Sequence, residues 1–188
     1  MNQQHIEKQT EVLLPVEELT IHLHWDTTLD LDIFAIFETK DGEKGMIYFA
    51  NSGSLEEAPF IELLFDFEFS EIPVDHQEII AISKMDAENI WIFGWDFDAV
   101  QDEHTLNFKE QDMFLEIRCQ EQQFLTSAVD LSEGNIALMG LFQKRPATSS
   151  ADSEQFYFRN YSEVRTISLP EQMEDLLHIL PDIFMHKM

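Results

Sequence analysis

Short stretches in which every second residue is apolar recur along most of the chain. In 16–25, the apolar residues that share one face are Leu19, Ile21, Leu23 and Trp25. Successive side chains of a strand point to opposite faces of its sheet, so this alternation predicts a strand with one buried face. Similar stretches follow at spacings of roughly 8–12 residues, which is typical of a β-sandwich.

The further predicted strands are 31–37, 46–50, 60–69, 78–82, 90–97, 113–119, 124–129, 135–142, 155–161 and 164–169. Asp41-Gly42 predicts a tight hairpin turn between two of these strands. The stretch 143–154 contains Pro146, Ser149 and Ser150, and this composition predicts a mobile loop.

Only the C-terminal end has the spacing of a helix. Ser168 and Glu171 are spaced as in a capping box, and Pro170 lies in the first predicted turn. The apolar residues that then recur with the helical period are Met173, Leu176, Leu177 and Leu180. Pro181 is expected to end this helix.

These patterns predict an all-β fold, an antiparallel β-sandwich with a short C-terminal helix. A chain of 188 residues with 44% hydrophobic residues and 16 Phe can bury a large core. We expect a flexible N-terminal segment at 1–15, one sandwich domain at 16–169, and the helix and tail at 170–188.

The chain is strongly acidic, with 37 Asp and Glu residues against 11 Lys and Arg and a formal net charge of −26. This charge argues against nucleic acid and anionic lipid as partners, and it fits a cation or a basic protein. No apolar segment is long enough to span a membrane, so we expect a cytoplasmic protein. The one cysteine, Cys119, excludes an internal disulfide and is expected to be a buried, inert thiol.

Two carboxylates stand out at the start of the predicted strand 31–37. Asp30 and Asp32 are two residues apart and so share one face, with Cα atoms roughly 7 Å apart. Such a pair either repels or holds a hard cation such as Ca²⁺, which binds six to eight oxygens. Further oxygen ligands from nearby turns would be Asp26, Asn51, Asp75 and Glu78. The residues alone leave both alternatives open.

Other constellations favour structural interpretations. His22 and His24 share a strand face and have the spacing of a zinc pair, but the solvated side of an amphipathic strand explains them better. The aromatic residues of 91–97 share one face, which favours core over a sugar-binding platform, and Asp96 and Asp98 are expected on the opposite face. No nucleophile elbow or phosphate-binding loop is present, so we assign no catalytic residues and predict that the protein is not an enzyme.

Several motifs together resemble the TerD-like (tellurium-resistance) stress-protein family. The residues that carry this resemblance are Trp25-Asp26, Leu29-Asp30-Leu31-Asp32, Phe34-Ala35, Tyr48-Phe49-Ala50-Asn51 and Trp95-Asp96-Phe97-Asp98-Ala99. The resemblance implies a β-sandwich of cytoplasmic bacterial proteins, linked to stress and tellurite resistance, that bind Ca²⁺ through acidic loops without enzymatic activity.

The resemblance also implies a set of calcium ligands. The family's Asp-Leu-Asp ligands fall on Asp30 and Asp32, its strand-end Asn falls on Asn51, and its later acidic block falls loosely on Asp75 and Glu78. The interval 56–69 lacks the glycines of the family's acidic loop, and glycine lets a backbone carbonyl approach an ion. This departure predicts one reduced calcium site or none.

Three functions are therefore open. The first is a calcium-binding stress-response protein. The second is a metal-independent subunit that binds a protein partner or a second copy through its strands or C-terminal helix. The third, less favoured, is a carbohydrate-active protein, which would need two acidic groups in an open cleft.

Overall fold

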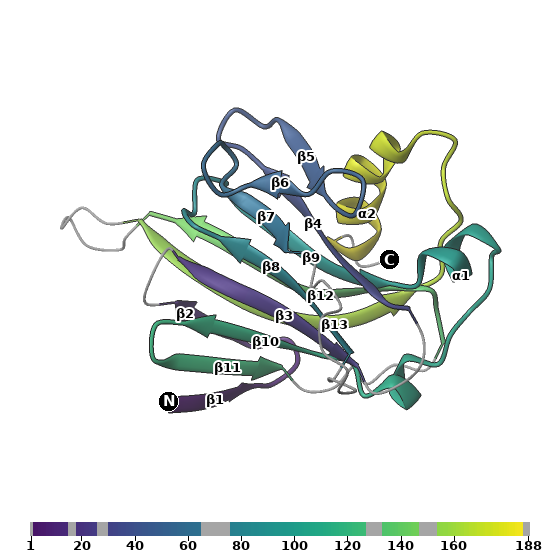
Figure 1. Cartoon of the computed structure of the whole chain (residues 1–188), viewed down its shortest axis with the longest axis horizontal. Helices are drawn as coiled ribbons and strands as arrows, with labels where there is room; N and C mark the ends of the chain where they lie inside the picture. Colours follow the sequence, from purple (N-terminus) through teal and green to yellow (C-terminus); the bar gives the residue numbers. More distant parts are fainter. Residues whose placement is uncertain are drawn as a thin grey trace.

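The computed structural model describes residues 2–14, 18–25, 30–64, 76–126, 133–146 and 154–185, which form two packed sheets (Figure 1). Sheet A contains, in spatial order, β1 (Asn2–Ile6), β11 (Gln122–Thr126), β10 (Phe114–Cys119), β3 (Leu19–Trp25), β8 (His76–Ile82), β7 (Ile61–Leu64) and β6 (Gly53–Ser54). Sheet B contains β2 (Glu11–Leu14), β13 (Gln155–Arg165), β12 (Ile136–Arg145), β9 (Asn89–Trp95), β4 (Asp32–Glu38) and β5 (Lys44–Ile47). The predicted all-β sandwich with a short C-terminal helix is confirmed.

The first core lies between the two sheets. Sheet A contributes the buried face that alternation predicted, and Ile21 and Leu23 of β3 are fully buried in it. Sheet B faces them with side chains such as Ile33 and Ile92. The outer face of sheet A carries polar residues, as expected for a sheet that has one face in the core.

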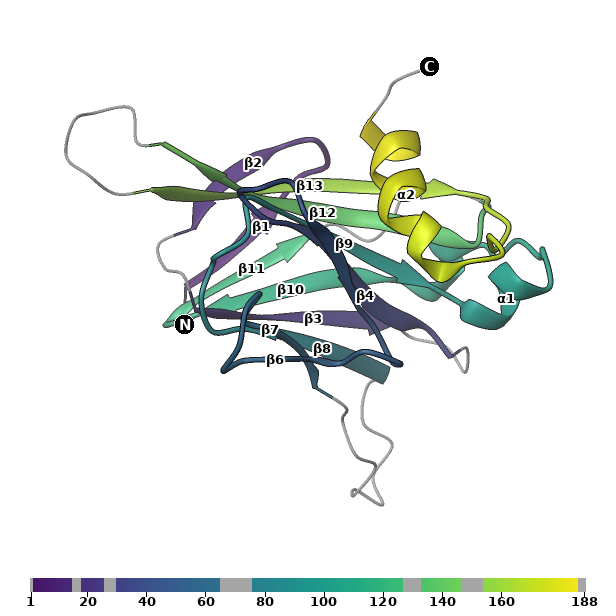
Figure 2. The ribbon, with the colours of Figure 1, turned by 90° about the horizontal axis from the view of Figure 1, so that it is seen from above.

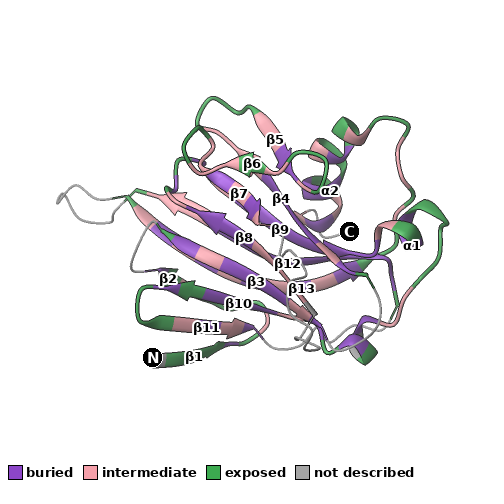
Figure 3. Cartoon of the chain, viewed as in Figure 1, coloured by how far each residue is buried: buried purple, intermediate pink, exposed green. Residues whose placement is uncertain are grey.

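Sheet B is apolar on both faces, unlike sheet A. In β9, Ile90 and Ile92 point into the core between the sheets, whereas Trp91, Phe93 and Trp95 belong to a second buried cluster. Figure 3 shows that burial continues through β4, β9 and β12. The aromatic run was correctly predicted to be core, but it lies in the outer cluster rather than between the sheets.

The C-terminal helix covers this second cluster. A 3₁₀ turn, η2 (Met173–Asp175), leads into α2 (Leu176–Met185), which packs across the outer side of sheet B (Figure 2). Leu176, Leu180 and Phe184 are buried against the sheet, and the Phe184 ring centre lies 5.7 Å from that of Phe93. The molecule therefore has three layers: sheet A, sheet B and α2.

Two short helical segments lie between β9 of sheet B and β10 of sheet A. The strand predicted over 90–97 ends at Trp95, because the Asp96 side chain accepts a hydrogen bond of 2.8 Å from the Ala99 backbone N–H. Asp96 thereby caps α1 (Phe97–Gln101), as Asp commonly does at a helix N-terminus. A 3₁₀ turn, η1 (Phe108–Gln111), precedes β10.

Several predicted boundaries were wrong. The two strands at 155–161 and 164–169 are one strand, β13, which has a bulge where Ser162 adopts a φ of 45° and the register with β12 shifts. The segment 1–15 contains β1 and β2, which the polar N-terminal sequence did not predict. The predicted mobile loop, 143–154, overlaps the end of β12 and stops just before β13 begins at Gln155.

The helix boundaries also differ from the prediction. The chain from Ser168 to Pro170 is not helical, so no capping box forms there. Pro181 lies inside α2 rather than at its end, because proline removes a single N–H and its ring is buried against sheet B. The predicted strand residues 65–69 and 127–129 and the loop residues 147–153 lie outside the described part of the chain. Within the described ranges, no helix is both long and apolar enough to cross a membrane.

The contacts of α2 lead to a stability prediction. Leu180→Ala and Phe184→Ala should each lower the free energy of unfolding by about 2–5 kcal/mol, since each leaves a cavity over the outer face of sheet B. Urea denaturation measures the loss, and stronger binding of a hydrophobic dye would report the uncovered cluster. His178→Ala, on the exposed side of the same helix, is the control and should change stability by less than about 0.5 kcal/mol. Equal losses in the control and the core variants would contradict this role for α2.

Candidate functional site

The two predicted carboxylates lie at one end of the sandwich, where β4 begins. Asp30 is exposed just before the strand, and Asp32 is half-buried as its first residue. Leu31 and Ile33 are buried in the core between the sheets. Because alternate residues face opposite ways, burial of this apolar pair directs the two aspartates away from that core.

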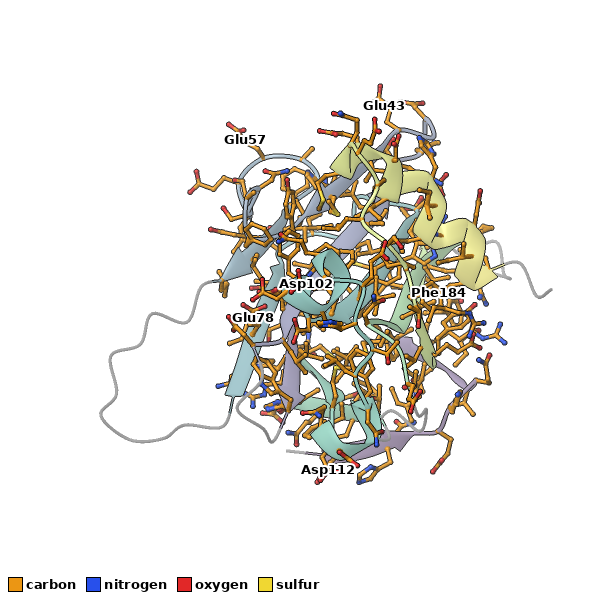
Figure 4. All side chains as sticks on the ribbon, turned by 90° about the vertical axis from the view of Figure 1, so that its right-hand side faces the viewer. Glu43, Glu57, Glu78, Asp102, Asp112 and Phe184 are labelled. Carbon is orange, nitrogen blue, oxygen red and sulfur yellow. The ribbon has the colours of Figure 1, made fainter. Side chains whose placement is uncertain are left out.

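Glu78 joins this end of the molecule from the other sheet. It lies on β8 directly opposite Leu23, a core residue, and therefore on the inner face of sheet A. Its Oε2 accepts a hydrogen bond of 2.6 Å from the backbone N–H of Ile33 on β4. One carboxylate thus links β8 of sheet A to the start of β4 in sheet B, and Figure 4 labels Glu78 at this place.

Two further carboxylates come from the neighbouring strand of sheet B. β9 pairs with β4 so that Trp95 lies opposite Asp32, and this register brings the following residues, Asp96 and Asp98, to the same end. The sequence analysis had placed these two aspartates on an opposite strand face. The sequence does contain a signal for their true position: an acidic residue before a short helical run is typical of a helix N-cap. This cap ends the strand at Trp95.

Burial and repulsion raise the pKa of two of these carboxyl groups, Asp32 and Glu78. The pKa of Asp32 is raised to about 6, first by burial and then by the charges of Asp30, Asp96 and Asp98. The pKa of Glu78 is raised to about 7, again mainly by burial and further by Asp32 and Asp30, although the Ile33 N–H opposes this shift. The site therefore favours uptake of a proton or of another positive charge.

Of the remaining predicted ligands, Asn51 alone lies within the described residues. Asn51 is exposed in the turn after β5, where its Nδ2 donates a hydrogen bond of 2.9 Å to the Met46 carbonyl. That turn lies beside α1, since the ring centres of Phe49 and Phe97 are 5.3 Å apart. Asp26 and Asp75 lie outside the described residues.

The three carboxylates are chemically suited to a hard cation, but their arrangement does not form a complete coordination shell. Asp30, Asp32 and Glu78 offer carboxylate oxygens, the ligands that Ca²⁺ prefers. Among the residues that the structure describes, no group of three or more His, Cys, Asp or Glu side chains is arranged to hold a metal ion. A Ca²⁺ ion here would therefore need water or backbone oxygens as additional ligands.

His22 and His24 belong to a separate polar network on the outer face of sheet A. His24 Nε2 lies 2.8 Å from Glu116 Oε2, and Arg118 and Gln123 donate hydrogen bonds to the same carboxylate. Burial alone would raise the pKa of Glu116, but the hydrogen bonds from Arg118, Gln123 and His24 outweigh it and hold the pKa at about 2. A salt-bridge network thus accounts for the histidine pair.

The solvated position predicted for these histidines is only partly correct. The His22 side chain lies on the outer face, yet the residue is only 5% exposed. Its burial, together with the charge of Arg118, lowers its pKa. Glu116, the centre of this network, was missed because two of its three partners, His24 and Gln123, come from other strands. Cys119 is buried as predicted, and burial raises the pKa of its thiol.

The raised pKa values predict how stability depends on pH. Between the ordinary carboxyl range and about pH 7, the folded state binds more protons at Asp32 and Glu78 than the unfolded state does. The contribution of these groups to the free energy of unfolding therefore falls as the pH rises from about 4 to about 7. The double variant Asp32→Asn and Glu78→Gln should weaken this dependence, since the Gln amide oxygen still accepts from Ile33.

Urea denaturation at acid and slightly alkaline pH, in EDTA, provides the measurement. The double variant should gain stability relative to the natural protein at the alkaline pH and little at the acid pH. The control is Glu43→Gln, an exposed carboxylate in the β4–β5 hairpin. An identical pH dependence in the natural protein and the double variant would count against electrostatic strain at this site.

Comparisons of the chain with protein-family models, with curated proteins and with solved structures found no match. The resemblance to the TerD-like family therefore rests on the motifs around Asp30, Asp32, Asn51 and Trp95, and family membership remains a proposal.

Proposed function

We propose that the protein is a TerD-like, cytoplasmic stress-response binding protein that takes up Ca²⁺ at the end of the sandwich formed by Asp30, Asp32 and Glu78. The observation that carries this proposal is that carboxylates of two sheets interact at this end: beyond the effect of burial, the charge of Asp30 raises the pKa of Asp32, and the charges of Asp32 and Asp30 raise the pKa of Glu78. A divalent cation relieves the same repulsion that a proton relieves, and it does so at neutral pH.

The proposed role of the ion is structural. Glu78 already links β8 to the start of β4 through the Ile33 N–H. An ion shared with Asp30 and Asp32 would strengthen this link between the sheets, because it neutralises charges that otherwise repel across it. Binding of Ca²⁺ to the folded state alone would then raise the stability of the whole domain.

The proposal assigns binding rather than catalysis. The thiol of Cys119 is buried and has a raised pKa, which are the properties of an inert cysteine. The aromatic face that a sugar platform would need lies under α2, where Trp91 is 5% exposed and Trp95 is fully buried. These features argue against the carbohydrate-active alternative.

A second candidate function is that of a metal-independent interaction subunit. It is favoured by the hydrogen bond from Ile33 to Glu78, which already compensates part of the buried charge without an ion. The outer side of α2 also exposes Ile179, at 40%, beside the half-buried Ile183 one turn later. Such an apolar ridge fits contact with another protein or a second copy.

Calcium titration tests the leading proposal. With Ca²⁺ at 100 times its dissociation constant, the free energy of unfolding should rise by about 2.7 kcal/mol. The double variant Asp30→Asn and Asp32→Asn should lose this gain, while Mg²⁺ should stabilise the natural protein less because it demands a stricter geometry. Thermal unfolding followed by circular dichroism, at near-neutral pH after EDTA treatment, gives the measurement.

The matched control removes two carboxylates elsewhere. Asp41→Asn with Glu43→Gln changes the net charge equally at the exposed β4–β5 hairpin and should keep the response to Ca²⁺. An equal response in both double variants, or none in the natural protein at millimolar Ca²⁺, would refute calcium binding at this site. A change of mass in solution caused by Ile179→Asp would then favour the interaction subunit.

A further inference from the structure

The few basic residues of this acidic chain are unevenly distributed. Of its four arginines, Arg145, Arg159 and Arg165 lie on the neighbouring strands β12 and β13. With 37 acidic residues against 11 basic ones, a cluster of arginines on one sheet is unexpected by composition. This surface is independent of the proposed calcium site, which lies where β4 begins.

Arginines and tyrosines alternate on the outer face of this part of sheet B. Along β13, Tyr157, Arg159 and Tyr161 are half-buried, whereas the residues between them are buried. The guanidinium carbon of Arg145 lies 4.7 Å from the ring centre of Tyr157, and that of Arg159 lies 5.3 Å from Tyr161. We call Arg145, Tyr157, Arg159 and Tyr161 the arginine–tyrosine strip.

Arg159 differs from the other arginines because it has no carboxylate partner among the described residues. Arg145 makes two hydrogen bonds to Glu11, of 2.8 and 2.6 Å, and Arg165 pairs with Glu163 at 3.3 Å. Arg159 has only a 3.4 Å contact from Nη2 to Gln9 Oε1, and its Nε is buried without a hydrogen-bond partner in the described structure. A buried N–H of a charged group that lacks an acceptor is costly, so this position favours an added anion.

The strip adjoins a free strand edge. β2 is the last strand of sheet B, and none of the described strands pairs with its outer edge. Leu13 of β2 lies opposite Tyr157 and is 50% exposed. In Figures 1 and 2, α2 covers the other end of β13, which leaves β2 and the adjoining part of the strip outside the helix.

From these features we infer that β2 and the arginine–tyrosine strip form a docking site for an extended, acidic segment of a partner protein. The segment would add to β2 as a further strand, with backbone hydrogen bonds supplying affinity. Its alternate side chains would face the strip, where an apolar residue covers Leu13 and a carboxylate reaches Arg159. Tyrosine and arginine are also the residues that contribute most to protein interfaces.

The choice of an acidic partner follows from charge. Elsewhere the protein is surrounded by its own carboxylates, and these repel an acidic segment. Glu11, the residue of β2 opposite Arg159, has both its carboxylate oxygens bound by Arg145, so the guanidinium of Arg159 offers such a segment a favourable contact. Planar carboxylates match the fork of the arginine side chain, which makes the recognition directional.

Titration of the isotope-labelled full chain with a peptide tests the inference. The probe is a capped octapeptide that alternates glutamate and valine, and its comparison peptide carries glutamine in place of glutamate. The acidic peptide should shift the backbone amide signals of Val12, Leu13 and Arg159 and bind at least tenfold more tightly than the glutamine peptide. Its affinity should also fall as the salt concentration rises.

Matched variants locate the contact. Arg159→Gln should weaken binding of the acidic peptide at least tenfold, whereas Arg165→Gln, on the same strand but beside α2, should leave the affinity unchanged. Leu13→Asp should also weaken binding, and it should preserve the fold because Leu13 is exposed. It tests the contact if Arg159→Gln fails to fold.

Three results would overturn the inference. The first is equal affinity for the two peptides, or no signal change at millimolar peptide. The second is an unchanged affinity in a folded Arg159→Gln variant. The third is a natural protein that is dimeric and that Leu13→Asp converts to a monomer, because the occupant would then be a second copy of the chain.

Discussion

The fold depends on a sheet that is apolar on both faces. In β4, β9 and β12 consecutive side chains, which face opposite ways, are buried, so sheet B needs a cover on each side. Sheet A supplies one cover, and α2 supplies the other through Leu176, Leu180 and Phe184. Sheet A needs no second cover, because its outer face is polar and holds the network around Glu116. The helix is therefore an integral layer of the domain and not an appendage.

The same layering explains why charge accumulates at one end. Strands of both sheets end or begin near Asp32, where the core no longer demands apolar side chains, and carboxylates from three strands meet there. Burial of Glu78 and Asp32 at this position costs free energy that the hydrogen bond from Ile33 only partly offsets. Carboxylates whose pKa is raised in this way are common in binding sites. A cation that relieves their repulsion binds more tightly, because the free energy of the repulsion is recovered on binding.

Much of the fold could be predicted from local patterns, and the exceptions have physical causes. Alternation located β3 and β10, and Asp41-Gly42 located a hairpin, since both signals act within a few residues. The polar strand β1 was missed because it is stabilised by pairing with β11 and not by its own hydrophobicity. The contact of Glu78 with the start of β4, and the lack of a carboxylate partner for Arg159 among the described residues, depend on which strands become neighbours. No local pattern contains that information.

The pairing of the N-terminal strands has a consequence for folding. β1 pairs with β11 and β2 pairs with β13, so each of these strands finds its partner only after a long intervening stretch of chain has been synthesised. Asn160 reinforces this arrangement, because its Nδ2 donates to the Ile6 carbonyl and its backbone exchanges hydrogen bonds with Gln9 and Thr10. The contact order is accordingly high, and closure of both sheet edges is a late event. Until those strands have been synthesised and paired, the sheets expose open edges, which are prone to aggregation.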